Sequence, residues 1–308
     1  MKTITAIGER RKSALPAYVL LALLAITLGV TSASILMPTN LINILSQQVS
    51  LLIATVGQTI VVMSGGLDLS VGSVVSMTAA IVSRDTVFAV PLAILAAAAV
   101  GLVNAFGILR LNIHPILMTL STMTAVQGVA LLVRPTPGGV APRFLVWFAS
   151  TDVFGLPVSI FLAAAVLLAA AYVVKRTRYG LHLLATGGSA RNASLGGVNI
   201  RTTIAIAYVA SALLACLAGL NLAGRMGSGD PLVGEAFAID SIAATALGGT
   251  QLTGGLGAVG GPAAGVLFLA LLSNGLNYIN ISTYYQMLIK GGLLIAAVCA
   301  HRRLIPGL

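Results

Sequence analysis

The stretch GGLDLSVG, residues 65–72, places one carboxylate inside an otherwise apolar part of the chain. From Ser13 to Ser83, Asp68 is the only charged residue. An ionisable group at membrane depth is energetically expensive and by default marks a functional site, with a partner or a water-filled cavity nearby. This stretch therefore predicts a polar interruption of a membrane-embedded segment, and it makes Asp68 the first candidate residue.

A near copy, GGTQLTGG, occupies residues 248–255, and both stretches follow the pattern G-G-x-x-L-[S/T]-x-G. Paired glycines break helices and allow close backbone approach, and a broken membrane helix is tolerated only against protein or water. A repeated glycine-rich break is typical of the substrate region of transporters. The candidate residues for helix breaks and the solute route in the two stretches are Gly65, Gly66, Asp68, Ser70, Gly248, Gly249, Gln251 and Thr253.

Helix capping is the alternative interpretation of the polar residues in these stretches. Asp68 or Ser70 would accept amide hydrogen bonds at the start of the following helix, and Thr253 would do the same after the second break. Capping and solute contact are compatible, and the residues alone leave both open. The second stretch carries Gln251 where the first carries Asp68, so the repeated architecture does not require a carboxylate.

The composition is that of a polytopic membrane protein. Hydrophobic residues make up 58% of the chain and charged residues 8%, whereas soluble domains carry about 25% charged residues. Since a helical span needs about 20 residues, we expect an all-α transmembrane bundle of about ten spans and no soluble domain. The formal net charge of +10 fits the basic cytoplasmic segments of membrane proteins and not a nucleic-acid partner.

The domain organisation follows from the charged segments between apolar runs. We expect a cytoplasmic N-terminal segment at residues 1–14, one transmembrane domain at residues 15–300 and a cytoplasmic tail at residues 301–308. Ten spans bring both basic termini and the basic loop at residues 175–201 to one side, which the positive-inside rule makes the cytoplasm.

Three apolar runs are short for a membrane crossing, so one pair of them could re-enter the membrane. Two of these runs flank the first glycine stretch, at about Val49–Met63 and Val71–Ser83, and the third precedes the second stretch. We expect the polar segment Pro38–Gln48 to be an interfacial turn. The proline-rich segment Arg134–Phe154 is expected to be a loop that carries an interfacial tryptophan.

The basic loop at residues 175–201 holds a candidate contact with a partner. Its centre, TGGSARNASLGGVN, predicts a short helix from about Ala190 to Leu195 with glycine pairs on both sides. A rigid short helix with small residues suits a groove on a partner, and the alternative is a solvated basic loop that only follows the charge bias. The candidate residues of this loop are Gly188, Ser189, Ala190, Arg191, Asn192, Ala193, Ser194 and Leu195.

Several kinds of chemistry have no support in the sequence. No G-x-x-x-x-G-K-[ST] stretch occurs, so the chain has no P-loop for a nucleotide. No Ser/His/Asp order and no metal-ligand spacing is visible, and we expect no catalytic residue, no metal and no cofactor. Lys290, inside the last apolar run, is expected to snorkel to the membrane surface, with solute binding as the lesser alternative.

Four blocks of the chain, in order, are GGLDLSVGS (65–73), GGSARNASLGGVN (187–199), DSIAATALGGTQLTGGLGAVGGP (240–262) and NGLNYINISTYYQMLIKG (274–291). Together they resemble the permease subunits of bacterial ABC importers for monosaccharides, of the ribose, xylose and galactose type. The resemblance covers about residues 15–300. Asn274 and Asn277, in the fourth block, complete the candidates for the solute route.

The resemblance implies a non-enzymatic transport subunit in the bacterial inner membrane, paired with a second permease copy or a homologous permease. It implies a cytoplasmic ABC ATPase, which the Ala190–Leu195 helix would contact as a coupling helix, and an extracytoplasmic sugar-binding protein. The sugar would pass along the subunit interface or through the bundle. Family loops commonly read G-G-N-E, whereas this chain has Gly187-Gly188-Ser189-Ala190, so the acidic residue that could meet a basic groove is absent.

Two alternatives stand beside a monosaccharide permease. The first is an ABC permease for a nucleoside or an autoinducer-like sugar. The second, from a different class, is an ion-coupled secondary transporter, which repeated broken helices also suit.

Overall fold

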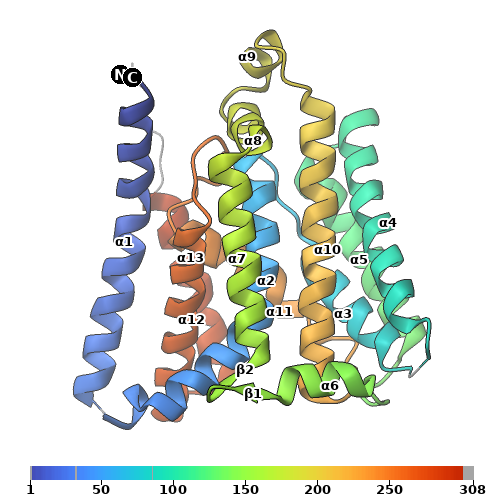
Figure 1. Cartoon of the computed structure of the whole chain (residues 1–308), viewed down its shortest axis with the longest axis vertical. Helices are drawn as coiled ribbons and strands as arrows, with labels where there is room; N and C mark the ends of the chain where they lie inside the picture. Colours follow the sequence, from blue (N-terminus) through green and yellow to red (C-terminus); the bar gives the residue numbers. More distant parts are fainter. Residues whose placement is uncertain (1, 32, 85, 301–308) are drawn as a thin grey trace.

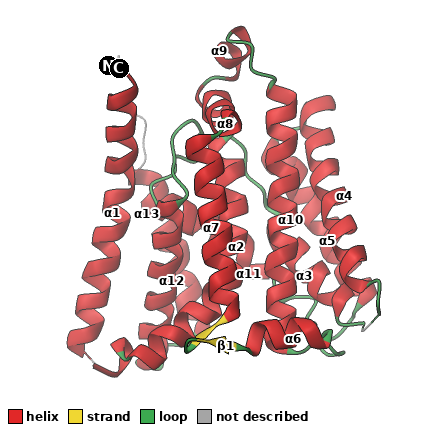
Figure 2. Ribbon diagram, viewed as in Figure 1, coloured by secondary structure: helices red, strands yellow, loops and turns green. Residues whose placement is uncertain are grey.

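The computed structural model describes residues 2–31, 33–84 and 86–300, and it is helical apart from one small hairpin (Figure 1, Figure 2). The elements in chain order are α1 (Lys2–Thr31), the 3-10 helix η1 (Ala33–Leu36), α2 (Pro38–Met63), α3 (Ser70–Val82), α4 (Ala89–Arg110), α5 (Pro115–Val133), α6 (Arg143–Ser150), β1 (Asp152–Val153), β2 (Leu156–Pro157), α7 (Val158–Arg176), α8 (Arg178–Gly188), α9 (Ala190–Leu195), α10 (Ile200–Met226), α11 (Glu235–Leu247), α12 (Gly260–Tyr278) and α13 (Thr283–Ala300). The helical fold class is as the sequence predicts.

The bundle has two ends, which we name by the elements that mark them. α8 and α9 lie at the α9 end, at the top of Figure 1, and α6 and the hairpin lie at the α6 end, at the bottom. The antiparallel hairpin pairs Asp152 with Pro157 and Val153 with Leu156. α6 lies across the α6 end and packs against α10.

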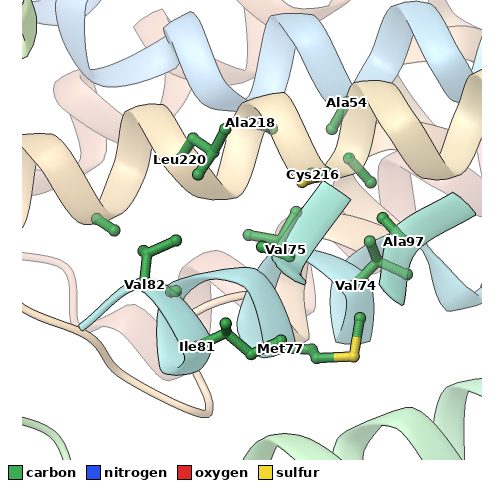
Figure 3. Close-up of a cluster of buried hydrophobic side chains, with 14 of the residues drawn as sticks. Ala54, Val74, Val75, Met77, Ile81, Val82, Ala97, Cys216, Ala218 and Leu220 are labelled. Atoms are coloured by element: carbon green, nitrogen blue, oxygen red, sulfur yellow. The ribbon is translucent and has the colours of Figure 1, made fainter. Parts of the chain in front are cut away.

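α10 is the central helix of the bundle and packs against α2, α3 and α4. Figure 3 shows part of the core, in which Val74 and Val75 of α3 lie among Ala54, Ala97 and Cys216 from the three other helices. Because lipid is as apolar as leucine, membrane helices associate through close packing of small residues and not through hydrophobicity. Small side chains at these contacts are what that packing requires.

Two glycines show how close the backbones come. A Cβ at Gly57 of α2 would lie 3.0 Å from the Cα of Ser211, and one at Gly101 of α4 would lie 2.7 Å from the Cα of Val209. Both contacted residues belong to α10. The position of α10 between α2 and α4 therefore depends on residues without a side chain.

The ten predicted apolar segments correspond to α1–α5, α7 and α10–α13. Among the described residues, five helices are long and apolar enough to cross a membrane, namely α2, α4, α5, α7 and α10. α3 and α11 have 13 residues each, which is about 20 Å of helix against about 30 Å of hydrocarbon. They are half-length helices: α3 follows the first glycine stretch, and α11 ends at the second. The count of ten crossings stays a prediction.

The expected turn at Pro38–Gln48 is wrong, because this segment is the first part of α2. Pro38 sits at the helix start, where its missing N–H has no intrahelical partner to lose. The polar side chains of the segment find partners in the protein: the Nδ2 of Asn40 donates to the carbonyl of Ile35 at 2.7 Å. Polarity here marks protein contacts inside a long helix and not a chain reversal.

The expected loop at Arg134–Phe154 is wrong for its central part, which forms α6 after Pro142. Trp147 of α6 is 62% exposed, which fits an interfacial aromatic residue. The predicted N-terminal segment is continuous with α1, which begins at Lys2. The predicted tail at residues 301–308 lies outside the described residues.

Candidate functional site

The first glycine stretch joins the end of α2 to the start of α3 through residues 64–69. Gly65 has a φ of +89°, in the left-handed region that favours glycine. A Cβ on Gly66 would collide with the hydroxyl of Tyr208 and would lie 3.2 Å from Cγ1 of Val61. Both glycines therefore serve the helix break itself.

Asp68 lies inside this break and is fully buried. Its Oδ1 accepts a hydrogen bond from the backbone N–H of Ser70 at 3.0 Å and a second one from the Ser70 hydroxyl. Its Oδ2 accepts from the hydroxyl of Ser211, on α10, at 2.9 Å. The Ser70 hydroxyl in turn accepts from Nδ2 of Asn104, on α4, at 2.9 Å. The carboxyl group thus ties the first residue of α3 to the central helix.

The backbone on the N-terminal side of α3 is also paired. With its carboxamide turned to suit both partners, Gln58 donates to the carbonyl of Asp68 at 2.8 Å and accepts from its N–H at 3.3 Å. The carbonyl of Leu67 accepts from the hydroxyls of Thr119, at 3.2 Å, and Tyr208, at 3.4 Å. A broken membrane helix needs such partners, since lipid supplies none. In this conformation the Asp68 carboxyl faces protein and is closed to solute.

The second glycine stretch is built differently. Gly248 ends α11, and Gly249 has a φ of +79°. A turn follows, in which the N–H of Gly254 donates to the carbonyl of Gln251 at 3.0 Å and the N–H of Gln251 donates to the carbonyl of Leu256 at 3.1 Å. The matching positions of the two stretches therefore do not have matching structural roles.

Thr253 does not cap α12, so that expectation is wrong. Thr253 is exposed and lies in the connecting loop, seven residues before α12 begins at Gly260. The helix starts later than the pattern suggests because the chain first makes a turn with Gly254 and Gly255 at φ +86° and +81°.

Both glycine stretches meet the glycines that end α8. A Cβ on Gly254 would lie 2.6 Å from the Cα of Gly65 and 3.0 Å from the Cα of Gly187. A Cβ on Gly255 would lie 2.5 Å from the Cα of Gly188. We name these five residues the glycine junction. Real Cβ atoms essentially never come within 3.0 Å of a heavy atom outside their own and the adjacent residues, so a side chain at either position would force the backbones apart.

The glycine junction explains the first glycine pair of the basic loop. Gly187 and Gly188 flank α9 as expected, since they end α8 just before it, and they also pack against the second glycine stretch. The N–H of Gly255 also donates to the carbonyl of Met63, the last residue of α2, at 3.1 Å. The end of α8 is therefore in direct backbone contact with the residues that follow both broken helices.

The predicted helix at Ala190–Leu195 is present as α9. Ser189 caps it, because its hydroxyl accepts from the N–H of Asn192 at 3.3 Å, a bond that satisfies a free amide of the first turn. Ala193 is buried, whereas Arg191 and Leu195 are exposed, Leu195 at 82%. The remaining α9 residues, Ala190, Asn192 and Ser194, are also exposed. Figure 1 shows α9 at the tip of its end of the bundle.

Asn274 and Asn277 lie in the last part of α12. Their hydrogen-bond partners are not those of the Asp68 network, which we define as Asp68, Ser70, Ser211, Asn104 and Gln58. The Oδ1 of Asn274 accepts from Nδ2 of Asn40 at 3.2 Å, and the Oδ1 of Asn277 accepts from Nε2 of Gln286 at 2.7 Å. Together with Ile35, Asn40 and Tyr278 they line a hollow of about 410 Å³. The candidate residues thus form three groups: the first glycine stretch with the Asp68 network, the second glycine stretch with the glycine junction and α9, and this asparagine hollow.

The family described as "Branched-chain amino acid transport system / permease component" matches residues 40–298. The chain belongs to this permease family. The ribose import permease of Escherichia coli K12 is 34% identical over 275 residues, which cover 86% of each chain. The ribose import permease of Bacillus subtilis strain 168 is 31% identical over 292 residues, 92% of this permease and 91% of the relative.

The D-allose transport system permease of Escherichia coli K12 is 29% identical over 295 residues, 92% of this permease and 90% of the relative. No solved structure matches. The resemblance to permeases of monosaccharide importers is thereby confirmed. With its apolar helices, this permease is a multi-pass membrane protein with a transport role.

Sequence reasoning missed the side chains that complete the Asp68 network of this permease. Gln58, Asn104 and Ser211 are polar residues within apolar helices. Such residues need partners because an unpaired buried polar group is costly, but this signal does not say which partner is used. Lys290 was expected to snorkel, and it instead pairs with Asp240 at 3.0 Å.

Proposed function

We infer that this permease is the membrane subunit of an ATP-driven importer that moves a monosaccharide through the bacterial inner membrane. The observation that carries the proposal is α9, a capped and exposed short helix at the tip of the bundle. A short exposed helix is a surface that a groove on a partner can hold. The partner we propose is a cytoplasmic ABC ATPase, because the chain has no P-loop of its own.

We assign the α9 end to the cytoplasm. Residues 175–201 carry five basic side chains and no acidic one, which is the bias of cytoplasmic segments. The α6 end then faces outward, toward an extracytoplasmic sugar-binding protein. A second permease copy or a homologous permease completes the transporter. In this chain the single transmembrane permease domain is residues 15–300.

The substrate class we propose is a pentose or hexose. Relatives that match most of the chain are named for ribose and D-allose, and one that is 35% identical over 201 residues is named for L-arabinose. The family description names branched-chain amino acids, so these are the competing substrate. An ion-coupled secondary transporter is the competing mechanism.

Reconstitution tests the proposal. The permease is purified with the ATPase and binding protein encoded beside it and placed in liposomes, and uptake of labelled ribose, arabinose, allose and leucine is measured. We expect ATP-dependent uptake of at least one sugar and none of leucine. Uptake of leucine alone would overturn the sugar assignment, and uptake by the permease without the ATPase, driven by an ion gradient, would overturn the ABC mechanism.

Charge reversal at Arg191 tests the docking role of α9. Arg191 is exposed, so Arg191→Glu should leave folding intact. In the interface between α9 and the ATPase, the new carboxylate would either be repelled by an acidic group or lie without a partner. Such a defect costs ~2 kcal/mol or more, and we expect sugar-stimulated ATPase activity to fall by about tenfold or more. Arg201→Glu, the same change at an exposed residue of α10, is the matched control. Unchanged stimulation in Arg191→Glu would remove α9 from the interface.

A further inference from the structure

The middle of the bundle holds an ion pair outside the three groups described above. The Nζ of Lys290, on α13, lies 3.0 Å from Oδ2 of Asp240, on α11, and the two side chains are only 22% and 15% exposed. Gln47 and Gln48 line the same cavity, and they lie near the middle of the 26 residues of α2. The pair is therefore far from both ends of that helix.

The cavity beside this ion pair combines polar groups from four helices. It has a volume of about 200 Å³. Its polar lining is Gln47 and Gln48 of α2, Asp240 of α11, Ser273 of α12 and Lys290 of α13. Phe237 and three leucines are among its apolar wall residues. Pockets for drug-sized ligands measure ~300–1,000 Å³, so this cavity suits a smaller solute.

The polar side chains around the ion pair remain accessible from the cavity. Lys290 and Asp240 satisfy each other, whereas Gln47 is exposed and Gln48 and Ser273 are only half-buried, so their polar groups are open to a solute. Charged and polar side chains inside a membrane protein pair with one another or face a water-filled cavity or a solute route, because lipid cannot pair them. A purely structural ion pair needs no further polar side chains beside it.

We propose that this cavity is a transient binding site for a polyhydroxylated solute on its way through the permease, an inference that rests on the proposed import function. The carboxylate of Asp240 accepts hydrogen bonds from sugar hydroxyls, the ammonium of Lys290 donates them, and the carboxamides of Gln47 and Gln48 do both. Phe237 supplies an apolar wall for the C–H face of the ring. Such a site combines an apolar lining with a few placed polar groups, as small-molecule sites do.

The asparagine hollow gives this cavity a polar neighbour along α12. Asn274 directly follows Ser273, and Asn277 lies one turn further toward the C-terminal end of α12. A solute that enters at the asparagine hollow would pass from three carboxamides to the ion pair. The route we assign therefore passes the asparagine hollow and this cavity, both of which α12 lines.

The test is the selectivity among sugars of the reconstituted complex with its ATPase and binding protein. Variants Gln48→Leu, Ser273→Ala and the paired change Asp240→Asn with Lys290→Gln are compared with wild type for uptake of labelled ribose, arabinose and allose at saturating loaded binding protein. The paired change keeps a neutral hydrogen-bonding couple, and Ser273→Ala removes a single hydroxyl, so these variants limit damage to the fold. Basal ATPase activity and thermal stability are measured in parallel.

The matched control is Gln127→Leu. Gln127 lines a different hollow, between α3, α5 and α11, and its carboxamide is already used by the carbonyl of Pro231 at 2.7 Å. A defect that is only structural lowers the uptake of all three sugars in proportion. A lost contact with solute changes the ratio between sugars, since their hydroxyls differ in position.

We expect Gln48→Leu and Ser273→Ala to change the uptake ratio between two sugars by about 2- to 10-fold, the range for one lost hydrogen bond of ~0.5–1.5 kcal/mol, with basal ATPase activity retained. If wild type imports sugar but all ratios stay constant in these variants, the site is overturned and the import function stands. A ratio change in Gln127→Leu alone would move the route to α5. If wild type imports no sugar, both proposals fall.

Discussion

Replacing Gly254 with alanine is expected to prevent assembly of a stable permease. The new Cβ would lie 2.6 Å from the Cα and 2.7 Å from the backbone nitrogen of Gly65, neither of which can move like the end of a flexible side chain. Gly254 also has a φ of +86°. Strain at such a position costs ~1–3 kcal/mol and overpacking ~1–3 kcal/mol, together a large part of the ~5–15 kcal/mol that stabilises a typical protein.

The measurement is the yield of monodisperse permease in detergent and its thermal unfolding midpoint. Gly197→Ala is the matched control, because Gly197 has a φ of +81° but nothing within 4 Å of its Cβ position. It carries the backbone strain without the collision, and we expect it to lose ~1–2 kcal/mol and to remain folded. Equal losses in the two variants would contradict the close packing of the glycine junction.

The junction has a consequence for coupling as well as for stability. Gly187 and Gly188 end α8, which precedes the proposed docking helix by one residue, Ser189. If a partner displaced α9, the end of α8 would move with it. Gly187 and Gly188 contact both glycine stretches through backbone atoms, so no flexible side chain could take up this movement. Packed backbone contacts of this kind transmit displacement because interiors are dense and little compressible.

The second large effect is expected at Asp68. Asp68→Ala removes the acceptor of the Ser70 amide, the Ser70 hydroxyl and the Ser211 hydroxyl, all at a fully buried position. Each buried donor left without an acceptor costs ~1–3 kcal/mol. We expect a loss of about 3 kcal/mol or more, measured as reduced assembly and a lower unfolding midpoint in detergent.

Asp68→Asn separates this structural role from solute contact. Asparagine keeps one carbonyl oxygen for the Ser70 amide, and its NH₂ can donate to the Ser211 hydroxyl, so we expect assembly and much of the transport activity to survive. A well-assembled Asp68→Asn complex that imports nothing would contradict a purely structural role. It would instead assign the carboxylate to the solute route in another conformation of the permease.

Much of the fold was predictable because its signals are local. The apolar runs between charges predicted the helices, and the polar, glycine-bounded run at Ala190–Leu195 predicted α9 with its bounds. Pro38–Gln48 was misassigned because polar residues read as an interface, whereas inside a bundle they can pair across helices, as Asn40 does with Asn274. Thr253 was misassigned because two similar stretches were expected to fold alike.

The candidate site was predictable only in its outline. Asp68 and the two glycine stretches were identified by their rarity in an apolar chain. Ser211, Gln58 and Asn104 could not be connected to Asp68, because nothing local relates residues that lie far apart in sequence. The same limit hid the pairing of Lys290 with Asp240, and with it the cavity beside this ion pair.

Apolar length and charge bias were enough to predict a membrane-embedded helical protein, because both are local properties of the chain, and the order of four motifs gave its resemblance to permeases. The role of the first glycine stretch could be seen only in the folded chain: Asp68 closes a buried network at the start of α3, and Gly65 lies against Gly254 and Gly187. Hydrogen bonds and close packing act between atoms within a few ångströms. Which distant residues come that close is a property of the folded chain as a whole.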